Sequence, residues 1–313
     1  MAVVTLDDIV DARERIAPFI RRTPLHPLGG GPLLKLESLQ ITGSFKVRGA
    51  FNHVLARRDE CRDGIITASS GNHGQAVAYV AKTLGMRAVV VVPENVIPLK
   101  AQAIIGHGAE LIRFGRYPED RVVKAQELAA HRRLHYVPPY DDPLIIAGQG
   151  TAGLEIVEDC PDVETVVVPV SGGGLVSGIA AAVKSLRSTA RVIGAEPAGA
   201  ARFTRSRQAG KPVMLERAET IADGLRALSP GRLTWAVASQ FVDEFRPIPD
   251  SAILSAVRLV LLDAHLLLEP SGATAVAVAL AAGLTDPSTV AVASGGNIDP
   301  PVLQAALSSR SEN

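Results

Sequence analysis

The sequence has little that would direct it to nucleic acid, a membrane or an oxidising compartment. Its 32 Lys and Arg residues are balanced by 32 Asp and Glu residues, so no basic excess marks a nucleic-acid-binding surface. Gly or Pro interrupts the apolar runs well short of a bilayer span, and the first residues lack the basic and apolar segments of a signal peptide. These absences argue against nucleic acid and membrane as partners and predict a cytoplasmic protein.

Cysteine is also scarce, since only Cys61 and Cys160 occur. Two cysteines so far apart indicate neither a disulfide framework nor a metal cluster, and we expect two buried thiols. The chain has 313 residues, of which 47% are hydrophobic, so it can bury a large core. Because this length exceeds that of a typical compact domain, the sequence predicts two lobes.

What the sequence does have is an alternation of apolar, β-branched runs with Ala-rich stretches. The runs at residues 87–93, 164–170 and 191–195 are predicted as strands, and residues 75–84, 99–105 and 175–186 as helices. Nearly continuous Val and Ile strands joined by helices are typical of parallel sheets with both faces covered. The predicted fold class is therefore α/β, with parallel-rich sheets covered by helices on both faces.

Four short segments combine glycine with serine, asparagine or lysine: SFKVRGA (44–50), SSGNHG (69–74), SGGGL (171–175) and SGGN (294–297). Lys46 lies between a serine, an aromatic residue and a glycine. A lysine in such a setting can lose solvation, so that its pKa falls and its amine becomes a nucleophile. A surface lysine at the start of a helix explains the first segment equally well. The other three segments favour the chemical role, because each lies where a predicted strand gives way to a helix or loop.

The SGGGL segment indicates a phosphate site. Gly172, Gly174 and Ser177 follow a predicted strand and open a helix, and Glu196 lies about 20 residues further on, as in a dinucleotide-binding unit. The three glycines fit equally a nest of backbone N–H groups around a monophosphate. No Gly-Lys-Ser/Thr ending follows, which argues against an ATP-binding loop. The segment alone leaves dinucleotide and monophosphate open.

The four segments occur in the order seen in one family of enzymes. The sequence resembles the threonine/serine dehydratase and serine racemase family, which are pyridoxal-phosphate enzymes of fold type II, also called tryptophan synthase β-like. The resemblance extends from about residue 5 to residue 300, with further matches at IIAGQGT (145–151), TIADG (220–224) and EPSGA (269–273). A dinucleotide enzyme would leave Lys46, Asn72 and Ser294 unexplained.

The resemblance implies pyridoxal 5'-phosphate as cofactor and assigns residues to it. Lys46 would hold the cofactor covalently, Phe45 would cover one face of its ring, and Asn72 would hydrogen-bond the ring hydroxyl. Ser294 would face the pyridine nitrogen. The remaining assigned residues would contact the phosphate through backbone N–H groups or lie beside the cofactor: Gly172, Gly173, Gly174, Leu175, Gly224 and Glu269.

The resemblance also implies a small hydroxy amino acid as substrate. Its carboxylate would bind at the start of a helix, near Ser69, Ser70, Gly71, Asn72 and His73. Lys46 would act as general base at the α-carbon. The implied activity is an ammonia-lyase that converts L-threonine to 2-oxobutanoate, or L-serine to pyruvate, with release of ammonia. Serine racemase and 3-hydroxyaspartate ammonia-lyase remain alternatives. In the latter case Arg121 is a candidate for the second carboxylate, although an ordinary exposed arginine explains it as well.

Two positions bear on the choice between lyase and racemase. The hydroxyl of Ser70 could return a proton to the α-carbon, or Ser70 could be a helix N-cap. Glu196 and Ala200 match a divalent-cation site of the family, but Arg202 replaces its second carboxylate. We therefore expect Arg202 to pair with Glu196 in place of a cation, and we predict no metal.

The resemblance finally implies an architecture. A large cofactor-binding domain would comprise residues 1–63 and 143–313, and a small mobile domain would comprise residues 64–142. Closure of the small domain would exclude water from the site. A homodimer is expected, without a C-terminal regulatory domain. Residues 308–313 are predicted to form a disordered tail.

Overall fold

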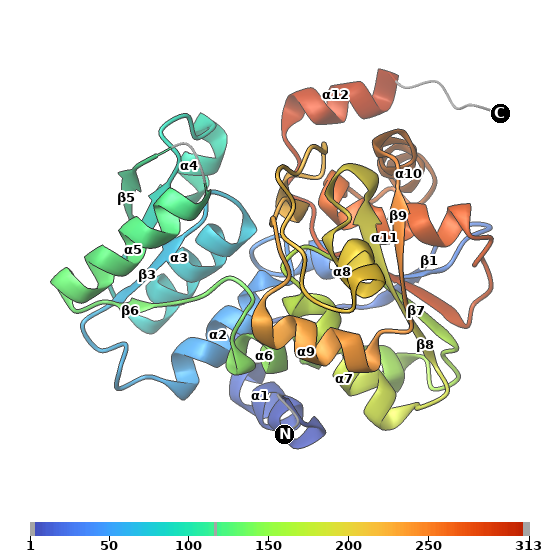
Figure 1. Cartoon of the computed structure of the whole chain (residues 1–313), viewed down its shortest axis with the longest axis horizontal. Helices are drawn as coiled ribbons and strands as arrows, with labels where there is room; N and C mark the ends of the chain where they lie inside the picture. Colours follow the sequence, from blue (N-terminus) through green and yellow to red (C-terminus); the bar gives the residue numbers. More distant parts are fainter. Residues whose placement is uncertain (1–3, 116–117, 309–313) are drawn as a thin grey trace.

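The computed structural model describes residues 4–115 and 118–308, so the end of the predicted tail lies outside the described residues. It contains a six-stranded and a four-stranded sheet, each flanked by helices (Figure 1). The strands of the smaller sheet all come from residues 65–136, and those of the larger sheet come from the chain before and after this range.

The larger sheet has the strand order β1-β2-β10-β7-β8-β9. Only β1 runs antiparallel to its neighbour, and all other neighbouring strands are parallel. Its strands are β1 (Leu25–Pro27), β2 (Leu33–Lys35), β7 (Thr165–Pro169), β8 (Arg191–Pro197), β9 (Glu244–Ile248) and β10 (Thr289–Val292).

Helices cover both faces of this sheet. Along β7, Val166 and Val168 pack with the residues of α7 (Gly174–Leu186), whereas Val167 packs with those of α11 (Pro270–Ala281). Because successive side chains of a strand point to opposite faces, α7 and α11 lie on opposite sides of the sheet. The buried Val runs seen in the sequence are thus the central parallel strands.

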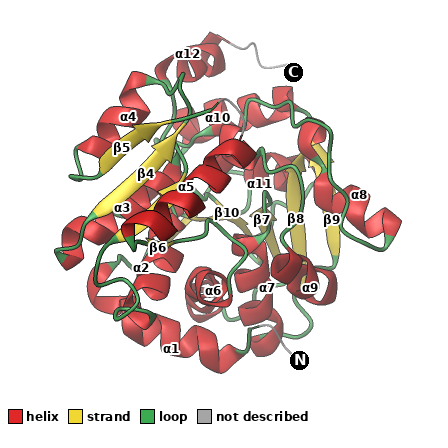
Figure 2. Cartoon of the chain, turned by 60° about the vertical axis from the view of Figure 1, so that its left-hand side comes forward, coloured by secondary structure: helices red, strands yellow, loops and turns green. Residues whose placement is uncertain are grey.

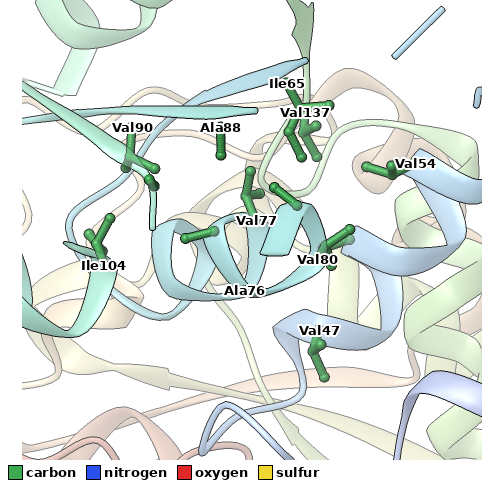
Figure 3. Packing of buried hydrophobic residues seen from close by; sticks show 14 of the residues in the cluster. Val47, Val54, Ile65, Ala76, Val77, Val80, Ala88, Val90, Ile104 and Val137 are labelled. Atoms are coloured by element: carbon green, nitrogen blue, oxygen red, sulfur yellow. The ribbon is translucent and has the colours of Figure 1, made fainter. Parts of the chain in front are cut away.

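The smaller sheet has the order β5-β4-β3-β6 and is parallel throughout (Figure 2). Its strands are β3 (Ile65–Ala68), β4 (Ala88–Val92), β5 (Glu110–Arg113) and β6 (His135–Tyr136). Figure 3 shows Val77 and Val80 of α3 (Asn72–Leu84) packed between this sheet and α2 (Lys46–Ala56). The opposite face packs against α5 (Pro118–Arg132) through Ile66 and Val89.

The remaining α-helices are α1 (Leu6–Ile16), α4 (Pro98–Ile105), α6 (Pro143–Asp159), α8 (Arg202–Ala209), α9 (Arg232–Phe241), α10 (Asp250–Asp263) and α12 (Pro300–Ser308). None of the helices within the described ranges is long and apolar enough to cross a membrane. The predicted fold class is confirmed, and the predicted strands and helices correspond to observed ones with ends shifted by up to three residues.

The expectation of two buried thiols is correct for Cys61 and wrong for Cys160. Cys160 caps the C-terminal end of α6, where the chain reaches the surface, and its Sγ lies 3.8 Å from the carbonyl oxygen of Pro287. Its thiol is therefore only partly covered.

Candidate functional site

The SFKVRGA and SGGN segments meet beside the larger sheet. Lys46 is the first residue of α2, and the preceding residue, Phe45, donates its N–H to the carbonyl of Ser294 over 3.2 Å. Ser44 forms an antiparallel bridge with Gly295. The side chains of Ser44 and Ser294 are buried, and Ser44 Oγ has no hydrogen-bond partner within the described residues. The start of α2 is thus fixed to the end of β10.

The Lys46 amine carries no carboxylate partner in the described part of the chain. Its Nζ donates to the carbonyl oxygen of Pro139 over 2.7 Å and lies 5.2 Å from the centroid of the Phe45 ring. Burial lowers the pKa of this ammonium to about 8. About a tenth of Lys46 is therefore a neutral amine at pH 7, able to act as nucleophile or base.

The SGGGL segment forms the turn between β7 and α7, and it has no room for a side chain at Gly172 or Gly173. Gly173 has φ +99°. A Cβ at this position would lie 2.5 Å from Cζ of Phe203 and 2.8 Å from Cβ of Thr234, and a Cβ at Gly172 would lie 2.4 Å from the Tyr140 ring. The side chain of Ser171 is accommodated, since its hydroxyl accepts the N–H of Ala227 over 3.3 Å.

Within the described chain, no acceptor receives the N–H groups of Gly172, Gly173, Gly174 and Leu175. The neighbouring helices differ in this respect, because Asp141 accepts three N–H groups at the start of α9 and Asp142 accepts two at the start of α6. Two helices near Lys46 thus carry a carboxylate at their N-termini, whereas α7 presents free donors suited to an anion.

The SSGNHG segment makes a second such turn, between β3 and α3 of the smaller sheet. Helix α3 begins at Asn72 with Gly71 as N-cap, and no side chain caps it. Gly71 donates its N–H to Ser69 Oγ over 3.3 Å. Of the two alternatives for Ser70, the N-cap is excluded, because the helix begins one residue later than such a cap requires. Ser70 instead lines a cavity.

His73 lies in the first turn of α3 with its side chain in the core. Its ring is buried, and Nε2 lies 3.1 Å from the carbonyl oxygen of Val137. Burial, with a smaller contribution from Lys46, lowers the pKa of this imidazole to about 3. The side chain is therefore neutral and fixed in the core at all physiological pH values.

Asn72 joins the two sheets at the site. Its Nδ2 donates to Glu269 Oε1 over 2.6 Å, and its Oδ1 accepts from Nδ2 of Asn297 over 2.7 Å. One amide hydrogen and one lone pair of Asn72 remain for a further partner. Burial, followed by the charge of Asp223, raises the pKa of Glu269 to about 8. Sequence analysis did not assign Asn297 to the site, although this residue closes the SGGN segment.

Gly224 lies beside the start of α11, at Ser271. It donates its N–H to Ser271 Oγ over 2.9 Å, so that this group is used within the protein. Its contact with the cofactor stays a prediction.

The predicted ion pair between Arg202 and Glu196 is absent from the described residues. Arg202 is buried and donates to the carbonyl oxygens of Val170, Ala200 and Leu225. Glu196 instead accepts from the backbone and side chain of the first turn of α8. The prediction of this ion pair is wrong because both groups find closer partners. Burial raises the pKa of Glu196, and the charge of Arg202 partly offsets this rise. No cluster of three His, Cys, Asp or Glu side chains suited to a metal occurs in the described ranges.

A cavity of about 800 Å³ adjoins the site. Ser70, Glu269 and Asn297 form part of its wall, and Arg121 of α5 lines it as well. The SSGNHG turn is thus open to small molecules from this side.

Comparisons with known proteins agree with this arrangement. Residues 16–295 match the model of the family described as pyridoxal-phosphate dependent enzyme. The chain is 40% identical over 311 residues to the catabolic L-threonine dehydratase TdcB of Staphylococcus aureus, in a match that covers 95% of this chain and 90% of that protein. Among solved structures, a maize serine racemase matches with a TM-score of 0.92 and 35% identity, covering 97% of each chain. The processed form of threonine deaminase isoform 2 from Solanum lycopersicum matches with a TM-score of 0.91 and 34% identity, covering 96% of this chain and 86% of that one. The chain therefore belongs to the family of pyridoxal-phosphate dependent enzymes.

Proposed function

We propose that this chain is a pyridoxal-phosphate-dependent ammonia-lyase that converts L-threonine to 2-oxobutanoate and L-serine to pyruvate, releasing ammonia. One observation carries the proposal. The amine of Lys46, whose pKa is lowered, lies near two glycine turns, and each turn leaves free N–H donors at the N-terminus of a helix. The names of the relatives, a threonine dehydratase and a threonine deaminase, support the same reaction.

The residues present fit pyridoxal phosphate. The N–H groups of the SGGGL segment suit its phosphate, and the glycines leave the space that a Cβ would fill. Lys46 would bind its aldehyde carbon, with Phe45 against the ring. The free amide hydrogen of Asn72 would serve the ring hydroxyl, and Ser294 would serve the pyridine nitrogen. Gly224 and Glu269 would border the ring.

When bound, the cofactor supplies an electron sink that weakens the bond between the α-carbon and its hydrogen. Lys46 would accept the α-proton at Nζ, which its lowered pKa permits near neutrality. The Ser69 to His73 turn would hold the substrate carboxylate at the positive end of α3 and so fix the α-hydrogen toward Lys46. The β-hydroxyl leaves with a proton as water, and hydrolysis then gives the 2-oxo acid and ammonia.

Serine racemisation is the second candidate, favoured by the position of Ser70 in the cavity wall and by the match to a serine racemase. Because Ser70 does not cap α3, its hydroxyl is available to return a proton to the α-carbon. Action on 3-hydroxyaspartate is a weaker candidate, because Arg121 lines the same cavity and could meet a second carboxylate.

We further propose that residues 64–142 move as one body that closes over the bound substrate, with residues 1–63 and 143–313 as the other. The enzyme would work in the cytoplasm as a homodimer. Exposed leucines near the C-terminal end, at positions 262, 267 and 307, offer apolar surface for such an interface.

The test is an ammonia-release assay of the holoenzyme with L-threonine, L-serine and 3-hydroxyaspartate, alongside the Lys46→Ala variant. We expect turnover of the first two that disappears in the variant. Absence of ammonia from all three amino acids in cofactor-loaded protein would refute the proposal. Turnover of 3-hydroxyaspartate alone would show that this amino acid, and neither L-threonine nor L-serine, is the substrate.

A further inference from the structure

The cavity beside the site is bounded by helices and loops of both sheets and carries many charges. Four cationic side chains line it, and four acidic ones: Lys100, Arg121, Arg217, Arg226, Glu216, Asp223, Glu269 and Asp299. Arg226 already donates to the Thr220 carbonyl, and Arg217 pairs with Glu219 over 3.3 Å. We call this cavity the vestibule, since it adjoins the site through Ser70, Glu269 and Asn297.

Lys100 makes two ion pairs across the vestibule wall, from α4 to the loops of the larger sheet. Its Nζ lies 2.9 Å from Asp299 Oδ2 and also contacts Asp223 Oδ2. The side chains of Lys100 and Asp299 are 13% and 18% exposed, so solvent screens this pair less than a surface pair, whereas Asp223 is 40% exposed. Burial lowers the pKa of Lys100, but the two carboxylates outweigh it and the pKa is raised. The ammonium is therefore charged at any physiological pH. We call Lys100, Asp223 and Asp299 the Lys100 bridge.

The loop before α12 carries both Asp299 of the Lys100 bridge and Asn297, which donates a hydrogen bond to Asn72. Asn297 donates to Asn72 at the start of α3, and Asp299, two residues later, receives Lys100 of α4. Helices α4 and α12 lie at the same end of the molecule (Figure 2). The loop before α12 thus contacts the smaller sheet's helices at two points, one polar and one ionic.

We propose that Lys100 is a positioning residue, which fastens α4 and the SSGNHG turn to the larger sheet over the vestibule and so holds Ser70 and Asn72 at the site. The inference rests on the proposed function for its kinetic part. Lys100 does not touch the reacting atoms; it acts through the loop that holds Asn72. Removing its charge leaves Asp223 and Asp299 facing one vestibule without a counter-charge from α4, and their repulsion opens the wall.

The experiment compares the holoenzymes of Lys100→Met, Lys100→Arg and Lys124→Met with the parent. Lys124 on α5 pairs with Glu127 over 3.2 Å at the surface, so its variant removes a similar charge away from the vestibule. In Lys100→Met we expect KM for L-threonine to rise about tenfold while kcat falls less than about threefold. The small effect on kcat is expected because the Lys100 bridge does not hold Lys46 or the SGGGL segment in place. Lys100→Arg should recover most of the loss, and Lys124→Met should behave as the parent.

Amide hydrogen exchange gives a readout that does not need turnover. In Lys100→Met, exchange should rise in residues 93–105 and at the start of α3, and remain unchanged in α7. If Lys100→Met does not fold, Asp299→Asn replaces it, with the same changes expected at smaller size. Parent-like KM and parent-like exchange in a folded variant overturn the proposal. If the parent itself releases no ammonia, the proposed function fails, and exchange alone decides whether Lys100 fastens α4.

Discussion

Gly173 combines a left-handed backbone with close packing, so the cradle for the phosphate tolerates no side chain there. We predict that Gly173→Ala loses bound cofactor, because its Cβ would lie 2.5 Å from Phe203 and φ is +99°. The absorbance of bound cofactor after gel filtration measures this. Gly283→Ala is the control, since Gly283 has φ +66° with nothing within 4 Å of the added Cβ. A folded Gly173→Ala with full cofactor content would contradict the assignment.

The pH dependence of cofactor uptake follows from the amine of Lys46. With a pKa of about 8, the reactive neutral form increases as pH rises through 8. We predict that cofactor-free protein binds pyridoxal phosphate about tenfold faster at pH 9 than at pH 7, which is the ratio of neutral amine at these pH values. Stopped-flow absorbance measures the rate. The Lys46→Ala variant should lack this dependence. A rise of about a hundredfold between pH 7 and pH 9, as expected for the ordinary lysine pKa of 10.5, would refute the lowered pKa.

Ser70 separates a lyase with one base from an enzyme that also racemises. If Lys46 alone handles the α-proton, Ser70→Ala keeps most deamination of L-threonine and L-serine, and it loses whatever D-serine formation the parent shows. Chiral chromatography of L-serine incubations measures both. Persistence of D-serine in the variant excludes Ser70 as the second acid-base group, and collapse of L-threonine deamination in a folded variant contradicts the one-base scheme.

For single residues, the sequence indicated which glycine segments precede helices but not which groups their side chains contact. Lys46 could be singled out because its neighbours are adjacent in the chain. Asn297 could not, since its bond to Asn72 depends on how a loop 225 residues away folds against α3. Arg202 was paired with Glu196 incorrectly because backbone carbonyls, which a sequence does not display, are its actual partners.

The element that carries Lys46 is held by a buried ionic network. Arg48, two residues along α2, is fully buried and binds the carboxylates of Glu37 and Glu155, each over 2.7 Å. Lys35 of β2 binds Glu155 over 2.6 Å. The network joins β2, α2 and α6, so it fixes the direction in which α2 presents Lys46.

We predict that Arg48→Leu lowers the free energy of unfolding by roughly 3–5 kcal/mol, because the buried Glu37 loses its ion-pair partner and Glu155 keeps only Lys35. Urea unfolding measures this. The control is Arg22→Leu, which breaks ion pairs with Glu158 and Asp159 at the surface. Arg22 is 50% exposed there, so the variant should cost less than about 1 kcal/mol. Equal losses in the two variants would show that the buried network contributes no more than a surface pair.

Secondary structure was predicted correctly where the pattern of apolar residues and the positions of glycine indicate the same element boundary. The Val-rich strands and the helices after the glycine turns were expected, and α3 and α7 begin earlier than predicted, at Asn72 and Gly174. The buried network was not expected, because its charges are spread over residues 35–155 and only the fold brings them together.

In the whole molecule, each sheet contributes at least one glycine turn to the site. The SGGGL and SGGN segments follow β7 and β10 of the larger sheet, and the SSGNHG segment follows β3 of the smaller one. Parallel sheets were predictable from composition and pattern. Their meeting at Lys46 was expected only through the resemblance to known enzymes, since no local pattern sets the relation between two sheets.

The central claim is that Lys46 holds pyridoxal phosphate between these turns. Borohydride reduction of the holoenzyme, followed by peptide mass spectrometry, tests it most directly. We predict a pyridoxyl label on Lys46, because its neutral amine lies beside the free N–H groups suited to the phosphate. A label on any other lysine, or none on a cofactor-loaded protein, would contradict the account.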